Sequence, residues 1–483
     1  MNIAEYAAHD ATSLAALVAK GEVTPKELAA TALAAIGRAN PAVNAVVETY
    51  GDRIDKLDES KLGSGPFCGV PFLIKDVFGH EAGRKCESGS RLAQGFVPET
   101  DSHLGLLIRA AGFNILGRTN APEYSISCTT ENALYGNTST PWANGASAGG
   151  STGGGMAAVV AGMVPIAQGG DIAGSIRVPA SWCGGVGLKP SRGRMPAGPA
   201  QDEGGFGLLS NFVQSKSVRD TAAALDCLAV PQVGDPFAIP RPSESYAALA
   251  RRPAPRLKIG WSVKPLMGSP VDSEVAAAVK ATAGRLAAMG HDVSEAGPEH
   301  DMAAACRRFL DIWFFGFDLR LDAIGAKTGR KAGPDTLEAT TLVAYEHAKR
   351  ITPATFLSAV AALNTARRNL GRFFAAGYDV WLSPTTATVA PKHGTFNLGR
   401  PGVTIETMVE KTLAMPAQFT LPHNVMGTPA ISLPLAMHSS GLPIGVQLGA
   451  RPAQEHIVLQ LAAALEADMP WAGRLPPLHV AKV

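Results

Sequence analysis

The feature that most constrains this chain is a glycine-rich segment that runs directly into an apolar one. Six of the eleven residues from Gly145 to Gly155 are glycine, and "MAAVVA" follows at once. Glycine lets a backbone turn sharply and approach other groups closely, so the pattern predicts a loop that leads into a buried helix. Two serines, Ser147 and Ser151, lie in this loop. Either hydroxyl is therefore a candidate for chemistry as well as for turn structure.

Short apolar runs and helical patterns alternate on both sides of this loop. "GVPFLIKDV" is typical of a buried strand, and "DSHLGLLIRAAGFNILGRTN" of a helix, a glycine turn and a strand. Thr24, Pro25 and Glu27 form a capping box with proline at the first helical position. Helices are also expected at Met156–Ala161, before Gly290 and through most of 301–377, and strands at "RLKIGWS", "DVWLSPT" and "ISLPLA". This alternation predicts an α/β fold.

Composition excludes several classes of protein. The chain is 46% apolar and 17% charged with a net charge of +2, which is typical of a globular enzyme and gives no reason to expect nucleic acid. The N-terminus lacks a signal-peptide pattern, and the longest apolar run, 156–167, is too short to span a membrane. The six cysteines form no C-x-x-C pair. A cytoplasmic location with reduced thiols and no membrane partner is expected.

Two familiar interpretations of the glycine loop fail on its residues. A phosphate-binding loop needs lysine and a hydroxyl residue after its last glycine, whereas Gly155 and Met156 follow Gly154. A nucleophile elbow at Ser147, in G-x-S-x-G, needs a strand leading into the serine, whereas "GNTSTPWANGA" is turn chemistry. No tight metal-ligand cluster is present either. Neither a cofactor nor a metal is expected.

Three residues remain, and each has a plain structural interpretation. Lys75 ends the apolar "FLIK", where a lysine that reaches the surface is the simpler reading. Ser151 could cap the following helix, and Ser175 lies in "GGDIAGSIR", where loop structure alone would explain it. Together they fit one mechanism. A lysine kept neutral by burial can deprotonate one serine, which deprotonates a second, while turn N–H groups stabilise the oxyanion.

The chain resembles the amidase signature family of serine hydrolases. The likeness rests on six blocks in the family's order: "GVPFLIKDVF", "ILGRTNAPEYS", "GNTSTPW", "GGSTGGGMAAVVAG", "GGDIAGSIRVPASWCGGVGLKPSRGR" and "NVMGTPAISLPLAMHSSGLPIGVQLGA". The resemblance implies one catalytic domain over 1–483, with a large mixed sheet sandwiched by helices. Its signature core would span about 60–200, a mainly helical substrate-side lobe about 257–377, and a C-terminal return to the core about 378–483. The proline-rich 231–255 segment would mark a lobe boundary.

The resemblance also implies roles for individual residues. Ser175 corresponds to the nucleophile that forms the acyl-enzyme, Ser151 to a bridging serine whose peptide bond is typically cis, and Lys75 to the base. The oxyanion hole would consist of the backbone N–H groups of Ile172, Ala173, Gly174 and Ser175.

Four residues near Ser175 affect the shape of its loop. Asp171 and Arg177 are expected to hold the loop together, since a buried charge needs a partner. Two positions depart from the family's Thr-Asp-x-Gly-Gly-Ser pattern: Gly170 replaces threonine and Ala173 replaces the first glycine. Alanine tolerates a positive φ less well, which puts the geometry at Ala173 in question.

Within the family, "IRVPASWCGGVGLKPSRGRMPAGP" and "FTLPHNVMGTPAISLPLAM" are most similar to the 6-aminohexanoate cyclic dimer hydrolases. That points to small linear or cyclic amides, with carbamates and aryl amides as alternatives. Core packing is the simpler reading of the aromatic "FLDIWFFGFD", although a substrate wall stays open. The candidate substrate contacts are Tyr124, Ile126, Ser127, Thr129, Trp313, Phe314 and Phe317.

Other functions stay open at this point. One is the glutaminase subunit of a tRNA-dependent amidotransferase, although the candidate wall is apolar and glutamine is polar. Another is a catalytically inactive binding protein, against which the intact Lys–Ser–Ser set argues. A small-molecule amide or carbamate is the expected partner, and a homodimer is left open.

Overall fold

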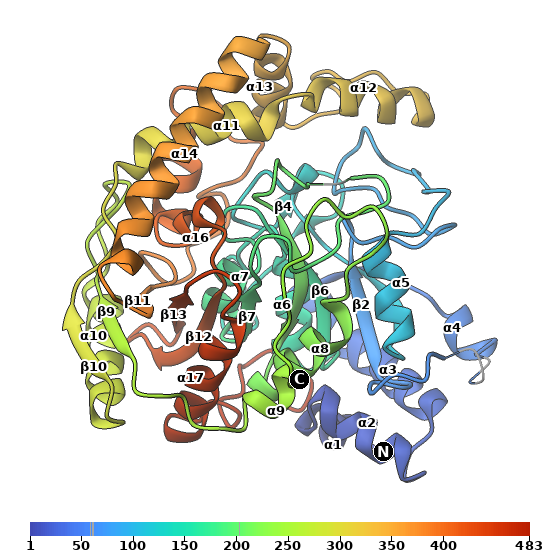
Figure 1. The fold of residues 1–483 in the computed structure, drawn as a ribbon. Helices are drawn as coiled ribbons and strands as arrows, with labels where there is room; N and C mark the ends of the chain where they lie inside the picture. Colours follow the sequence, from blue (N-terminus) through green and yellow to red (C-terminus); the bar gives the residue numbers. More distant parts are fainter. Residues whose placement is uncertain (58, 60–61, 202) are drawn as a thin grey trace.

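An eleven-stranded mixed sheet forms the centre of the molecule (Figure 1). The computed structural model describes residues 1–483 except 58, 60–61 and 202. The order of strands in the sheet is β1-β3-β2-β6-β8-β7-β12-β13-β11-β9-β10. These strands are β1 Val46–Thr49, β2 Pro71–Lys75, β3 Asn114–Thr119, β6 Ile166–Asp171, β7 Val186–Lys189, β8 Ser210–Ser215, β9 Lys258–Trp261, β10 Asp292–Glu295, β11 Val380–Pro384, β12 Ala430–Met437 and β13 Pro443–Ala450. A separate hairpin consists of β4 Glu131–Asn132 and β5 Gly136–Asn137.

The sheet combines two short parallel regions with antiparallel pairs. β2 is parallel to both β3 and β6, and β9 is parallel to both β10 and β11. The remaining pairs are antiparallel, including β6 with β8, where Gly170 lies opposite Asn211. Every residue of β2 and β6 is buried. Strands covered on both faces read as continuous apolar runs, which is why "FLI" could be recognised in the sequence.

Helices cover the sheet and extend beyond it. They are α1 Ile3–Ala8, α2 Ala11–Ala19, α3 Pro25–Val43, α4 Asp52–Asp55, α5 His103–Ala110, α6 Gly153–Val160, α7 Arg177–Cys183, α8 Val218–Leu228, α9 Tyr246–Leu249, α10 Ser273–Ala288, α11 Met302–Phe314, α12 Phe317–Thr328, α13 Ala339–Ala348, α14 Pro353–Ala375, α15 Ala414–Ala417, α16 Leu421–Met426 and α17 Glu455–Asp468. A 3₁₀ turn occupies Glu123–Ser125 and a π-helical turn Val409–Leu413. The fold is therefore α/β, as predicted.

Local sequence signals account for many of these elements. Thr24 Oγ1 accepts a hydrogen bond from Glu27 N at 3.1 Å, and Glu27 Oε2 accepts one from Thr24 N at 2.8 Å. This capping box begins α3, with Pro25 at its first position, as expected. The expected helix at Met156–Ala161 is confirmed as α6, which starts three residues earlier than the apolar run.

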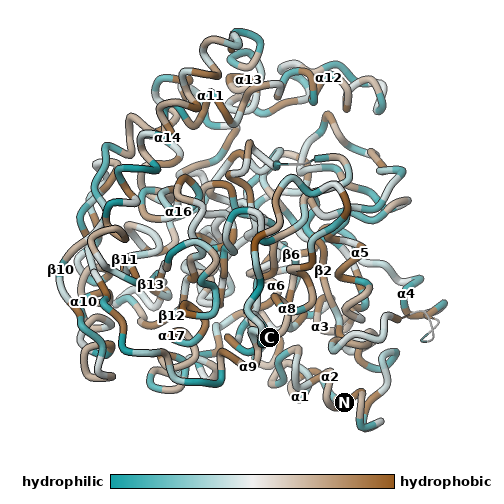
Figure 2. The backbone as a smooth tube through the Cα atoms, in the orientation of Figure 1, coloured by the Kyte–Doolittle hydropathy of each residue, from teal (hydrophilic) through white to brown (hydrophobic). Residues whose placement is uncertain are grey.

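Four helices form a group at one side of the sheet. In Figure 1, α11, α12 and α13 lie at the top of the view, and α14 runs from them down the left side, where Phe373 packs against Gly260 of β9. α11 packs against α14, and α14 packs against α16, which connects this group to the core. β9 and β10, which precede α11 in the chain, belong to the central sheet. Figure 2 shows hydrophobic backbone segments concentrated around central strands such as β2 and β6.

The apolar interior divides into two large clusters. One lies around the sheet and helices α3, α6, α8 and α17, and the other joins α11–α14 to the loops that follow β3 and β6. Among the described residues, all six cysteines are unpaired. No described helix combines the length and the hydropathy needed to cross a membrane.

Candidate functional site

Lys75 is the last residue of β2, and it is only 1% exposed. A lysine that reaches the surface, the simpler reading of "FLIK" alone, is therefore excluded, and Lys75 is buried as the combined mechanism requires. Its Nζ donates a hydrogen bond to Ser151 Oγ at 2.8 Å, and its backbone N–H donates to Gln168 Oε1 at 2.7 Å. The amine is therefore held in the interior and directed at one serine.

Burial changes the acid–base properties of this amine. The loss of hydration disfavours the ammonium form and lowers the pKa of Lys75 to about 7, although the charge of Asp171 opposes the shift. A side chain with a pKa near neutrality can exchange protons with a reacting group at physiological pH.

Ser151 lies between the glycine-rich loop and α6. The Gly150–Ser151 peptide bond is cis, and Ser151 is 1% exposed. The residue at the N-terminal cap of α6 is Thr152, whose side chain does not cap the helix, and the N–H of Gly153 donates instead to Thr130 Oγ1 at 3.0 Å. The Ser151 hydroxyl is bonded to Lys75 instead, so helix capping does not explain this serine.

Ser175 lies in the short loop between β6 and α7. Its carbonyl oxygen accepts a hydrogen bond from Thr152 N at 3.2 Å, which ties the Ser175 loop to the residue after Ser151. The side chain is 5% exposed, and within the described part of the chain its hydroxyl forms no hydrogen bond. The three residues named from the sequence thus lie on adjoining segments, with the Ser175 hydroxyl uncommitted.

Backbone N–H groups gather beside Ser175. Considering only the described residues, none of the N–H groups from Ile172 to Ser175 donates a hydrogen bond. Thr420 Oγ1 donates to the Ala173 carbonyl oxygen at 2.6 Å, which fixes the direction of the peptide between Ala173 and Gly174. Gly174 has a φ of 138°, and a Cβ there would collide with Thr420. Glycine is therefore required at this position.

An ion pair between Asp171 and Arg177 holds the two ends of the Ser175 loop together. Arg177 donates to both carboxylate oxygens of Asp171, at 2.9 Å each, and both side chains are fully buried. Burial alone would raise the pKa of Asp171, but the Arg177 charge and the hydrogen bonds lower it below its usual value. Asn424 adds hydrogen bonds to Asp171 at 3.0 Å, and Gln447 accepts from Arg177 at 2.8 Å. These contacts support a structural role for Asp171 and Arg177.

The two departures from the family pattern have separate explanations. Ala173 is not among the residues with a positive φ, so alanine meets no backbone penalty there. At Gly170, a Cβ would lie 2.7 Å from Asn211 Oδ1 on β8, so a larger side chain would have to displace Asn211. Position 170 is therefore restricted by the neighbouring strand.

The predicted substrate contacts lie close to one another. Tyr124 meets Phe317 edge-to-face with ring centroids 5.8 Å apart, and Trp313 stacks on Phe314 at 5.3 Å. Tyr124, Ile126, Phe314 and Phe317 share a buried cluster with Ile172 and Ala173, and the half-buried Trp313 packs against it. Ser127 Oγ donates to the Phe396 carbonyl at 3.1 Å, and Thr129 lies beside it, fully buried. Ser127 and Thr129 are thus engaged within the protein.

Sequence patterns missed several residues that organise the site. Gln168, Thr420, Asn424 and Gln447 hold Lys75 or the Ser175 loop. Thr420 and Asn424 lie in "FTLPHNVMG", part of a block that resembles the family, and this likeness was the one signal in the sequence that could have pointed to them. Ser147 is fully buried, and its hydroxyl accepts from Gly149 N at 3.1 Å, as turn chemistry predicts.

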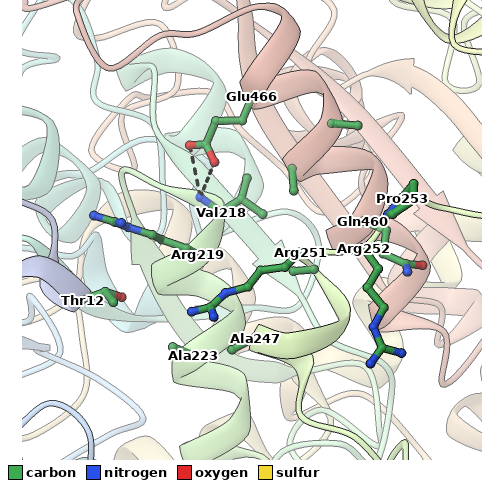
Figure 3. Close-up of a pocket in the computed structure, with 13 residues that line it drawn as sticks. Thr12, Val218, Arg219, Ala223, Ala247, Arg251, Arg252, Pro253, Gln460 and Glu466 are labelled. Atoms are coloured by element: carbon green, nitrogen blue, oxygen red, sulfur yellow. Dashed lines mark hydrogen bonds between the residues drawn. The ribbon is translucent and has the colours of Figure 1, made fainter.

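Two cavities lie apart from these residues. One of about 440 Å³ is lined by residues of α8, α17, α9 and the segment that follows α9, including Arg219, Glu466 and Arg251 (Figure 3). There Glu466 accepts hydrogen bonds from Val218 N at 3.3 Å. Another of about 620 Å³ lies among α1, α2 and the C-terminal residues. Neither is lined by Lys75, Ser151 or Ser175.

Known proteins resemble this chain over nearly its whole length. The family model described as Amidase matches residues 27–459. A 6-aminohexanoate-cyclic-dimer hydrolase of Pseudomonas sp. (strain NK87) is 38% identical, covering 97% of this chain and 96% of that protein. An acylamidase of Rhodococcus erythropolis is 32% identical, covering 96% of each. A solved structure of 6-aminohexanoate cyclic dimer hydrolase with substrate matches with a TM-score of 0.92 at 36% identity, covering 98% of this chain and 99% of the other.

Proposed function

The chain belongs to the amidase signature family, and on that premise we propose that it hydrolyses C–N bonds of small linear or cyclic amides through an acyl-enzyme on Ser175. Membership of the family makes it an amidase. The identity of the nucleophile, the relay and the substrate is the proposal. The hydrogen bond of 2.8 Å between Lys75 Nζ and Ser151 Oγ carries it, because it joins a base of suitable pKa to a hydroxyl beside the Ser175 loop.

The proposed chemistry needs only residues of this chain. Neutral Lys75 accepts the proton of Ser151, Ser151 accepts that of Ser175, and Ser175 Oγ attacks the amide carbonyl. The N–H groups of Ile172–Ser175 stabilise the oxyanion of the tetrahedral intermediate. Its collapse breaks the C–N bond, and the proton on Lys75 returns through Ser151 to the leaving amine. Water then hydrolyses the acyl-enzyme by the same proton path.

Two observations support the choice of substrate class. The relative at 38% identity is named for a cyclic amide, and the one at 32% for acylamides. The aromatic residues around Tyr124 and Phe317 favour an apolar substrate over glutamine. Lactams and apolar acyl amides are therefore the first substrates to assay, with aryl carbamates beside them.

The decisive experiment combines labelling and turnover. The wild type should hydrolyse part of a panel of anilides, lactams, short linear amides and aryl carbamates, and a fluorophosphonate should add one label to Ser175. Ser175→Ala should lose both properties while keeping its thermal unfolding transition. Ser147→Ala is the matched control, because that serine lies in the same glycine-rich region and should keep the label.

Two results would contradict the proposal. Full turnover by Ser175→Ala would exclude the assigned nucleophile. Activity that appears only with partner chains and glutamine would instead indicate an amidotransferase subunit.

A further inference from the structure

A loop at residues 203–209 turns sharply beside the segment Ile172–Ser175, whose N–H groups form the proposed oxyanion hole. Gly205, Phe206 and Gly207 have φ values of 59°, 54° and 78°. A Cβ placed on Gly205 would lie 2.5 Å from Ile172 Cδ1, so the turn touches the first residue of that segment. Leu208 shares the buried cluster that contains Ile172. The turn therefore borders the position expected for the substrate carbonyl.

Phe206 carries an aromatic ring at the tip of this turn. The side chain is 48% exposed, and its ring centroid lies 4.6 Å from Phe356 on α14 and 6.2 Å from Phe315 at the end of α11. Phe315, itself 37% exposed, stacks on Phe356 at 4.5 Å. These three rings form a half-exposed aromatic rim between the turn and the helical group.

Backbone geometry argues against phenylalanine as a residue chosen for the turn alone. A bulky residue with a positive φ is unusual, and glycine would adopt the same conformation without strain. A half-exposed ring also leaves apolar area in contact with water. The turn alone therefore does not explain phenylalanine at position 206. Its closeness to Ile172 suggests that the ring contacts the substrate.

We propose that Phe206 is a specificity-determining residue: the rim formed by Phe206, Phe315 and Phe356 receives the apolar body of an amide whose carbonyl lies at Ile172–Ser175. The inference rests on the proposed function. It narrows the substrate class to amides with an aromatic ring or an extended methylene chain near the carbonyl. An aromatic face covered by such a group contributes about a tenfold gain in kcat/KM per ring contact.

The test compares two substrate series, anilides of increasing acyl length and acetamides of increasing N-alkyl length. Phe206→Gly removes the ring and suits the turn, whereas Phe206→Tyr keeps the ring. In at least one series, Phe206→Gly should lose roughly tenfold in kcat/KM on the longest members and less than about twofold on the shortest. Phe206→Tyr should keep the dependence on length. Leu357→Ala, which changes a neighbouring 65% exposed side chain on α14, should keep it as well.

Each outcome has a distinct meaning. If Phe206→Gly keeps the wild-type dependence on length in both series, the ring only ties the turn to the helices and the inference is wrong. If the wild type hydrolyses no amide, the proposed function fails together with it. Should Phe206→Gly not fold, Phe206→Asn serves in its place, because asparagine also tolerates a positive φ.

Discussion

Lys75 occupies a buried position of β2, where an apolar side chain would be usual. Its contact with Ser151 is useful in the proposed mechanism only when the amine is neutral. Because burial lowers the pKa of Lys75 to about 7, the neutral form dominates above that pH and the ammonium form below it. The chemistry of this residue should therefore appear directly in the pH dependence of turnover.

We expect kcat/KM to fall about tenfold per pH unit below about pH 7 and to level off above it. A pH–rate profile measures this limb. The control is Lys189, a second buried lysine whose pKa is also lowered to about 7 by burial and whose Nζ donates to the Pro190 carbonyl. Lys189→Met should keep the acid limb. A limb that vanishes in that variant, or never appears in the wild type, would argue against Lys75 as the base.

The Ser175 loop, which carries the proposed oxyanion hole at Ile172–Ser175 and is called the oxyanion loop below, has a shape that depends on a distant helix. Thr420, at the start of α16, holds the Ala173 carbonyl, so the N–H of Gly174 points the opposite way. Thr420→Val keeps the shape of the side chain and removes the donor. We expect kcat to fall about tenfold or more with little change in KM, because the donor N–H groups matter most in the transition state.

Serine at position 420 gives the matching control. Thr420→Ser keeps the hydroxyl and should restore most of kcat. Equal kcat in the valine and serine variants would show that the hydrogen bond to Ala173 does not position the loop.

The Asp171–Arg177 pair supports the same element through charge. Arg177→Met leaves a buried carboxylate unpaired, so we expect a loss of about 3–5 kcal/mol in the free energy of unfolding and loss of turnover. Arg194 and Glu455 form another buried ion pair, joining the segment after β7 to α17. Arg194→Met should lower stability similarly, but the remaining folded enzyme should keep its kcat/KM. Denaturant unfolding with active-site titration by fluorophosphonate separates the two effects.

At the scale of the whole molecule, the buried lysine has a measurable cost. The pKa of Lys75 is about 7 in the folded chain against 10.5 for a free side chain, so the unfolded chain binds more protons between these values. Stability contributed through this group therefore rises with pH across that window, by about 1.4 kcal/mol per unit.

Lys75→Met should consequently be inactive but stabilised relative to the wild type, with an advantage larger at pH 7 than at pH 9. Melting temperatures at several pH values test this, with Lys26→Met on the exposed face of α3 as the control that should show no such trend. A constant difference in Tm between Lys75→Met and the wild type from pH 7 to 9 would contradict the shift in the pKa of Lys75.

The features that the sequence predicted best are those determined by residues close together in the chain. The capping box of α3 and the apolar run of β2 are local signals, and both elements lie where expected. The apolar run alone left the burial of Lys75 open, because the Ser151 hydroxyl that receives its Nζ comes from a segment 76 residues further along the chain. Thr420 and Ala173 are 247 residues apart in the chain, a separation that no periodic pattern can bridge. The family likeness supplied the residues now proposed to react, but not these supports.

That long separation has a consequence for biosynthesis. Domains begin to fold while the ribosome is still adding residues, and the N-terminal part emerges first. Lys75, Ser151 and Ser175 leave the ribosome long before Thr420, Asn424 and Gln447, which hold the oxyanion loop in shape. A nascent chain should thus carry its reactive groups for most of translation without a finished catalytic loop. We expect the ability to react with a fluorophosphonate to arise only when the last third of the polypeptide has been released.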